Sequence, residues 1–180
     1  GIDYEQLMRP DTGEYLNATS FAKYREEGGW VIAFSTPEVS MSAAVQSPLT
    51  IIATDSIIEN GKGHPRTAGS YTKVLGDYVR TKGELELSEA ISKMTIMPAR
   101  RLENRAPDFR QKGRVKVGAD ADLAVFNPDT VIDQSTYTDP TKPPIGMNHV
   151  IVNGIPVVAN GRLEPGAYPG KGIYAKLKGE

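Results

Sequence analysis

Two short runs of consecutive apolar residues stand out early in the chain. Residues 30–34 read Trp-Val-Ile-Ala-Phe, and residues 49–54 read Leu-Thr-Ile-Ile-Ala-Thr. Continuous apolar runs of this length are typical of strands that are buried on both faces, as in a parallel sheet. A helix is expected between them over 37–46, with Thr36 as its N-cap and Pro37 near its start. Strand, helix and strand in this order predict a βαβ unit with a right-handed crossover.

The clearest helical periodicity lies in residues 70–81. Their apolar positions recur at intervals of three and four residues, which places them on one helical face, namely Tyr71, Val74, Leu75, Tyr78 and Val79. We therefore expect these side chains, the tyrosines included, to pack in the core. Gly83 follows directly and is expected to end the helix.

Three further helical segments are predicted from their end signals. Residues 21–27 follow Ser20, a good N-cap, and precede a glycine pair. Residues 88–93 begin at Ser88, which is expected to cap the helix. A short helical turn is expected after Pro98.

From residue 113 the pattern changes to short alternating segments. Residues 114–117 alternate polar and apolar, as in a half-exposed strand, and 123–126 form another strand candidate. Residues 149–158 predict a hairpin, because Asn153-Gly154 is a strong signal for a two-residue turn. Asn160-Gly161 marks another turn, and residues 165–180 are expected to run irregularly over the surface.

This change of pattern predicts an α/β chain of two parts. Residues 1–103 hold the buried strands and the helices, and residues 104–180 hold short antiparallel strands and the C-terminal tail. The formal net charge is −1 and no basic patch stands out, so nucleic acid is not an expected partner. Nor does any apolar run reach the roughly 18 residues of a membrane span. A cytoplasmic location is expected, with a possible homo-oligomer.

The residue inventory restricts the chemistry. The chain has no cysteine and two histidines, His64 and His149, which stand far apart. A disulfide, a cysteine nucleophile and a cysteine-based zinc site are therefore excluded. No His-x-His or HExxH spacing is present either, so this chain by itself is not expected to hold a metal.

Asp55 is the strongest candidate for chemistry. It follows directly on the second apolar run, at the carboxyl end of a predicted parallel strand. Catalytic groups collect at that end in parallel α/β folds. A carboxylate there can act as a general base or bind a metal, whereas the alternative is a helix cap or a loop-stabilising residue.

A second candidate group lies in the loop that follows. Arg66 can hold a substrate carboxylate through two parallel hydrogen bonds, although a solvated ion pair with a neighbouring acid is the simpler interpretation. His64 could be a ligand, although a lone histidine is more often structural.

Three stretches of the chain resemble the amidohydrolase superfamily, and within it the N-acyl-D-amino-acid deacylases, or D-aminoacylases. The first is Ile51-Ile52-Ala53-Thr54-Asp55-Ser56. The second, which is the most subfamily-specific of the three, is His64-Pro65-Arg66 with the following Gly69-Ser70 and the segment 74–80. The third runs from 87–102 to Gly113-Arg114-Val115 and Gly118-Ala119-Asp120-Ala121-Asp122-Leu123. The resemblance covers nearly the whole chain and is weakest over residues 1–28.

The resemblance implies the last βα units of a TIM-type barrel, followed by part of a small β-sandwich. It implies that one or two divalent metals, typically zinc, and Asp55 activate water to attack the amide carbonyl of an N-acyl-D-amino acid, with Asp55 also a possible metal ligand. Arg66 resembles the residue that binds the substrate α-carboxylate, with His64 beside it.

The chain departs from the family pattern in one major respect. The early barrel strands with their histidine ligands are not in this sequence, and two predicted strands cannot close an eight-stranded barrel. We therefore expect an N-terminal part of the same enzyme, or a partner chain, to complete it, and no activity without it. Two alternatives stay open: a hydantoinase-like or dihydroorotase-like cyclic amide hydrolase, and a non-catalytic assembly domain.

Overall fold

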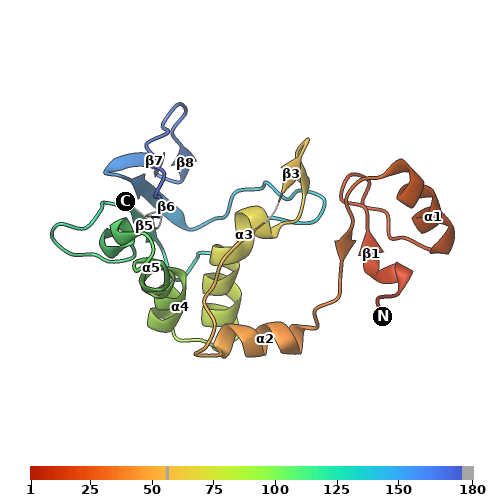
Figure 1. Ribbon diagram of the computed structural model, residues 1–180, viewed down its shortest axis with the longest axis horizontal. Coiled ribbons are helices and arrows are strands. Elements are labelled where there is room, and N and C mark those ends of the chain that lie inside the picture. Colours follow the sequence, from red (N-terminus) through yellow and green to blue (C-terminus); the bar gives the residue numbers. More distant parts are fainter. Residues whose placement is uncertain (56, 176–180) are drawn as a thin grey trace.

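The N-terminal end forms a small module with its own buried residues. A computed structural model describes residues 1–55 and 57–175. The module contains the 3₁₀-helix η1 (Tyr4–Gln6), strand β1 (Leu7–Met8), helix α1 (Ala18–Glu27) and strand β2 (Ile32–Ala33). The two strands pair antiparallel, and Met8, Leu16 and Ile32 are buried around them. This module lies at one end of an elongated arrangement (Figure 1).

An extended segment leads from this module to the helical centre of the chain (Figure 1). Helix α2 (Glu38–Gln46) comes first, followed by a hairpin of β3 (Ile58–Glu59) and β4 (Lys62–Gly63). Helix α3 (Arg66–Lys73) continues directly into the π-helical segment η2 (Val74–Thr81). Helices α4 (Leu87–Met94) and α5 (Ile96–Leu102) and the 3₁₀-helix η3 (Pro107–Gln111) complete this part.

The C-terminal part is one four-stranded antiparallel sheet. Strands β5 (Leu123–Phe126), β6 (Met147–Val152), β7 (Ile155–Ala159) and β8 (Arg162–Leu163) pair in sequence order. The predicted hairpin is confirmed, and Asn153 and Gly154 both have positive φ, 48° and 79°, as a tight two-residue turn requires. The turn at Asn160-Gly161 is confirmed as well, between β7 and β8.

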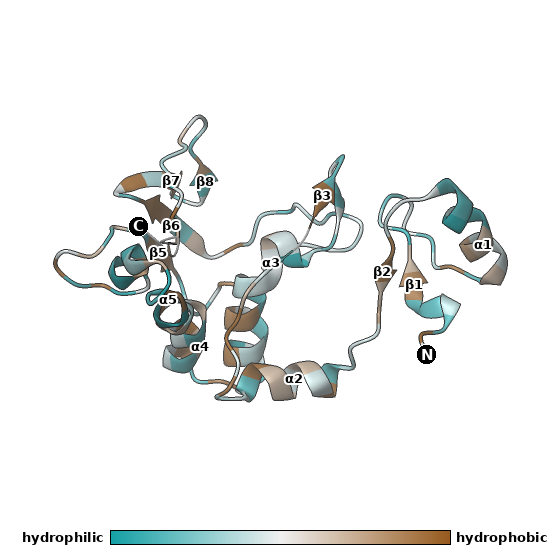
Figure 2. Cartoon of the chain, viewed as in Figure 1, coloured by the Kyte–Doolittle hydropathy of each residue, from teal (hydrophilic) through white to brown (hydrophobic). Residues whose placement is uncertain are grey.

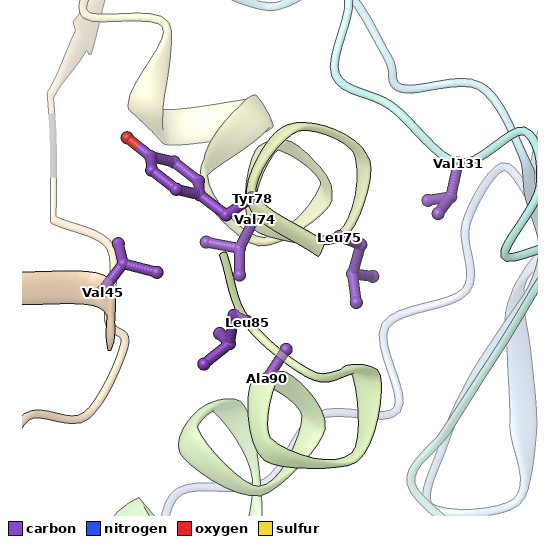
Figure 3. Close-up of a cluster of buried hydrophobic side chains, with 7 residues drawn as sticks. All are labelled: Val45, Val74, Leu75, Tyr78, Leu85, Ala90 and Val131. Carbon is purple, nitrogen blue, oxygen red and sulfur yellow. The ribbon is translucent and has the colours of Figure 1, made fainter. Parts of the chain in front are cut away.

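The main hydrophobic cluster joins the helical part to the C-terminal part. It contains side chains from α2, from η2, from the η2–α4 connection, from α4 and from the segment after β5, namely Val45, Val74, Leu75, Tyr78, Leu85, Ala90 and Val131 (Figure 3). Three members of the predicted helical face, Val74, Leu75 and Tyr78, are therefore in the core, whereas Tyr71 is 42% exposed. Within residues 1–55 and 57–175, no helix combines the length and apolar character needed to cross a bilayer.

The predicted parallel βαβ unit is wrong for this structure. Residues 30–34 contribute only the short β2, which pairs antiparallel with β1, and Trp30 is 56% exposed. Residues 49–54 form no ladder: Leu49 stands in a turn and is 94% exposed, and residues 50–54 have no regular secondary structure. A strand buried on both faces needs neighbours on both edges, and the described residues do not supply them to this segment.

Several predicted boundaries are also corrected. Helix α1 begins earlier than expected, because Asn17 rather than Ser20 accepts the first helical N–H groups. Helix α2 has Pro37, not Thr36, at its N-cap, and α4 has Glu86, not Ser88. The helix predicted at 70–81 begins at Arg66.

The strand expected at 114–117 is wrong. These residues form a loop in which Val115 and Val117 are almost fully exposed, so the alternation of polar and apolar residues has no sheet to pair with. The tail is irregular as far as it is described, and residues 176–180 lie outside the described range.

Lys93 is fully buried and fastens the segment that leads to Asp55. Its Nζ donates to the carbonyl of Ser47, which is the C-cap of α2, and to the carbonyl of Thr50 at 3.1 Å. Its own carbonyl accepts the N–H of Ile52 at 3.1 Å. A cation is favourable at a helix C-terminus, where the last carbonyl groups are otherwise unpaired. Lys93 thus fixes residues 47–52 through both its side chain and its backbone.

We expect Lys93→Met to lower the free energy of unfolding by about 1–3 kcal/mol, because the half-buried carbonyl groups of Ser47 and Thr50 lose their charged donor. Chemical denaturation of the complete protein measures the change. Lys142→Met is the matched control, since Lys142 is exposed, and it should shift stability by less than about 0.5 kcal/mol. Equal stabilities of the two variants would contradict the assigned role of Lys93.

Gly76 permits the close contact between η2 and the segment after β5. A Cβ added there would lie 2.7 Å from the carbonyl oxygen of Val131. On the next helical turn, Arg80 Nη1 donates to the carbonyls of Pro128 at 3.1 Å and Val131 at 2.6 Å. The two parts of the chain are therefore joined by backbone contact as well as by the hydrophobic cluster.

We expect Gly76→Ala to destabilise the protein by about 1–2 kcal/mol, since overpacking against a backbone carbonyl outweighs the gain in helix propensity. Thermal unfolding measures the shift. Gly170→Ala is the control, because an added Cβ there meets no atom within 4 Å. A stabilised Gly76→Ala protein would show that this contact can relax freely.

Candidate active site

Asp55 directly follows the segment that Lys93 holds. Its side chain is 95% exposed and its Oδ1 lies 3.3 Å from Nη2 of Arg66, whose own side chain is 51% exposed. The Nε of Arg66 also donates to the main-chain carbonyl of Asp55. An ion pair this exposed contributes little to stability, because water screens it and two side chains must be ordered. The Asp55 carboxylate is therefore held in place by one partner and is otherwise open to solvent.

Hydroxyl groups tie the backbone of Arg66 to the Asp55 segment. Thr54 Oγ1 donates to the carbonyl of Arg66 at 2.7 Å, and Ser70 Oγ donates to the same carbonyl at 2.8 Å. Arg66 is the first residue of α3, so the helix fixes its direction. These bonds place two residues that are 11 apart in sequence beside each other.

His64 is held by its neighbour two residues along. Its Nδ1 accepts the backbone N–H of Arg66 at 3.0 Å. Burial, and secondly the charge of Arg66, lower the pKa of the imidazole from its usual value of 6.5. The ring is therefore neutral near pH 7, as an accepting Nδ1 requires.

An open cleft of about 610 Å³ adjoins these residues. Asp55, His64 and Arg66 line one part of it, and residues of the N-terminal module, including Trp30 and Ile32, line another. The apolar residues of β2 and the start of β3 are brown in Figure 2, and both strands contribute to the cleft wall. The cleft thus places a carboxylate and a guanidinium beside apolar surface, a combination suited to a small amphipathic ligand.

All three residues that the sequence singled out are brought together in this cleft. His149 is not among them, since it lies in β6 and pairs with Val125 of β5. Ser56, which belongs to the same sequence motif as Asp55, lies outside the described residues. Over the part of the chain that the structure describes, no group of three or more His, Asp or Glu side chains could hold a metal ion.

Two aromatic residues near the site were not predicted to belong to it. Trp30 was expected in a buried strand, but its Nε1 donates to Oε2 of Glu59 at 2.9 Å at the cleft wall. Tyr137 comes from the segment between β5 and β6, and its ring lies 5.3 Å from that of His64. No motif or spacing in the sequence connects either residue to the site.

Most of the chain matches the model of one protein family. The model of a family described as "Amidohydrolase family" matches residues 40–158, which includes Asp55, His64 and Arg66.

Curated relatives are similar over large parts of this chain. An N-acyl-D-glutamate deacylase of Alcaligenes xylosoxydans xylosoxydans is 37% identical over 140 residues, which is 78% of this chain and 27% of the relative. A D-aminoacylase of the same organism is 38% identical over 108 residues, 60% of this chain and 21% of the relative. The chain therefore spans about a quarter of the length of the curated relatives it matches.

Solved structures of the same kind are similar in fold. An N-acyl-D-glutamate deacylase from Bordetella bronchiseptica, in complex with zinc and a phosphonate mimic of the tetrahedral intermediate, is 31% identical with a TM-score of 0.74. The match covers 89% of this chain and 37% of that one. A D-aminoacylase with a binuclear metal centre gives a TM-score of 0.71 at 31% identity, over 79% of this chain and 29% of that one.

Proposed function

Because this chain belongs to the amidohydrolase family, we propose that it forms part of the active site of an enzyme that hydrolyses the amide bond of N-acyl-D-amino acids. The observation that carries the proposal is the pairing of an exposed carboxylate with a guanidinium in one cleft. Curated relatives at 37–38% identity that act on N-acyl-D-amino acids, by their names, support the same substrate class.

The roles of the two charged residues follow from the two ends of such a substrate. An amide carbonyl must be attacked by water, and a carboxylate that is open to solvent can accept the proton of that water and pass it to the leaving amine. A guanidinium can bind the α-carboxylate of the substrate through parallel hydrogen bonds. We assign the first role to Asp55 and the second to Arg66.

The remaining groups of the site have supporting roles. His64, through the N–H of Arg66, holds the start of α3 in place. The apolar residues of β2 in the cleft wall offer a surface for an acyl group or an apolar side chain.

Zinc fits this site only in part. The Asp55 carboxylate is an acceptable oxygen ligand, but a zinc site takes several protein ligands, and the described residues hold no cluster of three. We propose that the other ligands come from polypeptide beyond these residues. Such a metal lowers the pKa of a bound water and polarises a carbonyl oxygen.

We further propose that residues 49–54 are the last strand of a TIM-type barrel, which the rest of the protein completes. The exposed apolar side chains of Leu49 and Ile51 in this segment support it, because a neighbouring strand and helix would cover them. The sheet β5–β8 would likewise form part of a small β-sandwich, since Leu123, Val125 and Leu163 are exposed on it.

The test is the release of free amino acid from paired substrates. The complete protein that carries these residues, loaded with zinc, is expected to hydrolyse N-acetyl-D-amino acids at least tenfold faster than the L-enantiomers. No hydrolysis of either enantiomer, in protein shown to contain zinc, would refute the proposal.

Two other functions are distinguished by simple measurements. A cyclic amide hydrolase would open a hydantoin or dihydroorotate ring, and the absorbance of those substrates reports the opening. A non-catalytic assembly domain would give a stable, monodisperse 180-residue protein without metal. The names of the curated relatives at 37–38% identity favour the deacylase over both alternatives.

A further inference from the structure

The segment between β5 and β6 runs from the C-terminal part to the candidate active site. Ser135 Oγ donates to the carbonyl of Pro65 at 2.9 Å, and Lys62 Nζ donates to the carbonyl of Thr138 at 3.1 Å. Helix α3 approaches this segment closely at Gly69, because a Cβ added there would lie 2.8 Å from Oδ2 of Asp133. Residues on both sides of His64 are therefore bound to this one segment.

Tyr137 lies at the centre of these contacts and is half-buried. Its ring meets the imidazole of His64 edge to face, with centroids 5.3 Å apart and an interplanar angle of 77°. On another side the ring of Phe34 meets it edge to face, at 4.9 Å and 69°. Aromatic pairs with this geometry are favourable beyond the area that they bury, so they select one orientation of the imidazole.

The orientation of the imidazole matters because of the next bond. His64 Nδ1 can accept the N–H of Arg66 only while the ring plane points at that N–H. That bond and the hydroxyl groups of Thr54 and Ser70 fix the backbone of Arg66. A residue that orients the imidazole thereby also orients the first turn of α3.

We propose that Tyr137 is a positioning residue that acts through His64 to hold Arg66 for the substrate carboxylate. The proposal rests on the proposed function of Arg66. It gives the C-terminal part of the chain a role in substrate binding, although its sheet supplies no side chain to the cleft wall.

The kinetic test compares two variants of the complete, zinc-loaded protein. Tyr137→Leu removes the aromatic pair, whereas Tyr137→Phe keeps the ring and is the matched control. For an N-acyl-D-amino acid, the leucine variant is expected to raise KM about three- to tenfold with little change in kcat, the size expected from the loss of an aromatic pair. For the N-acyl amine that lacks the carboxylate, its KM should equal that of the unchanged protein.

A second readout does not depend on catalysis. The titration of the His64 imidazole is followed by nuclear magnetic resonance and is assigned by the signal that His64→Asn removes. Burial lowers the pKa of His64, so the leucine variant should move the midpoint up towards 6.5, while the phenylalanine variant should not. The charged groups that line the same cleft are identical in both variants, namely Arg9, Asp11, Asp55, Glu59, Lys62 and Arg66.

The two readouts separate the possible failures. If the unchanged protein releases no amino acid from the N-acyl-D-amino acid, the proposed function fails. The imidazole titration still decides whether Tyr137 positions His64. A leucine variant with an unchanged titration midpoint would overturn the proposal, as would an equal rise of KM for both substrates.

Discussion

Replacing Asp55 by asparagine is expected to lower kcat for an N-acyl-D-amino acid by about 10²–10⁴-fold, the contribution typical of a general base. Asparagine has the same shape but cannot take a proton from water. The fold should be unaffected, because Asp55 is 95% exposed and its ion pair with Arg66 contributes little to stability. Steady-state kinetics of the complete, zinc-loaded protein, with the zinc content measured in parallel, test this expectation.

The control for this change is a carboxylate outside the cleft. Asp129 is exposed in the turn after β5, and Asp129→Asn should leave kcat within twofold of the unchanged protein. A full loss of zinc in Asp55→Asn would assign the residue to metal binding instead of proton transfer. Unchanged turnover would remove Asp55 from the active site altogether.

Replacing Arg66 by methionine is expected to raise KM for the same substrate by about 10–100-fold, because hydrogen bonds to a charged group contribute about 1.5–3 kcal/mol. Arg66→Lys should recover part of this loss, since lysine keeps the charge but not the paired geometry. An N-acyl amine without a carboxylate should bind equally to all three proteins. Initial rates over a range of substrate concentrations measure these differences.

Arg101→Met is the matched control, because Arg101 is exposed on α5, away from the cleft. It should leave KM unchanged for both substrates. If Arg66→Met weakened the neutral amine as much as the acid, the arginine would serve the fold and not the carboxylate.

Local signals in the sequence predicted the local structure well. The hairpin of β6 and β7 follows from Asn153 and Gly154, whose positive φ values suit a two-residue turn whatever surrounds them. The helix of residues 66–81 follows from its apolar face. Its start was missed because Pro65 occupies the N-cap without a side-chain hydrogen bond, so no capping residue marks it.

Segments that depend on distant partners were predicted poorly. The apolar runs 30–34 and 49–54 suit strands, but a ladder needs a neighbouring strand. Among the described residues, the first run pairs only with the two-residue β1, and the second is bonded to Lys93 with no strand beside it. The cap of α1 shows a smaller error, which is local. Ser20 does take part in capping, but as the partner that accepts the N–H of Asn17 at 3.0 Å.

The candidate site was only half predictable. Asp55 and Arg66 follow from a family motif that places both in one loop region. In the structure, Oδ1 of Asp55 lies 3.3 Å from Nη2 of Arg66. Tyr137 and Trp30 reach the site through the tertiary fold, from segments with no motif of their own. Such residues carry no signal in a single sequence, since aromatic side chains serve cores equally well.

The account depends most on Asp55 and Arg66 acting on one bound substrate. The most direct measurement is calorimetric titration of an N-acyl-D-amino acid into Asp55→Asn protein and into the double variant with Arg66→Met, with the product assayed afterwards. We expect the single variant to bind the substrate and leave it intact, and the double variant to bind it at least tenfold more weakly. Equal affinities of the two variants, or rapid hydrolysis by either, would contradict the account.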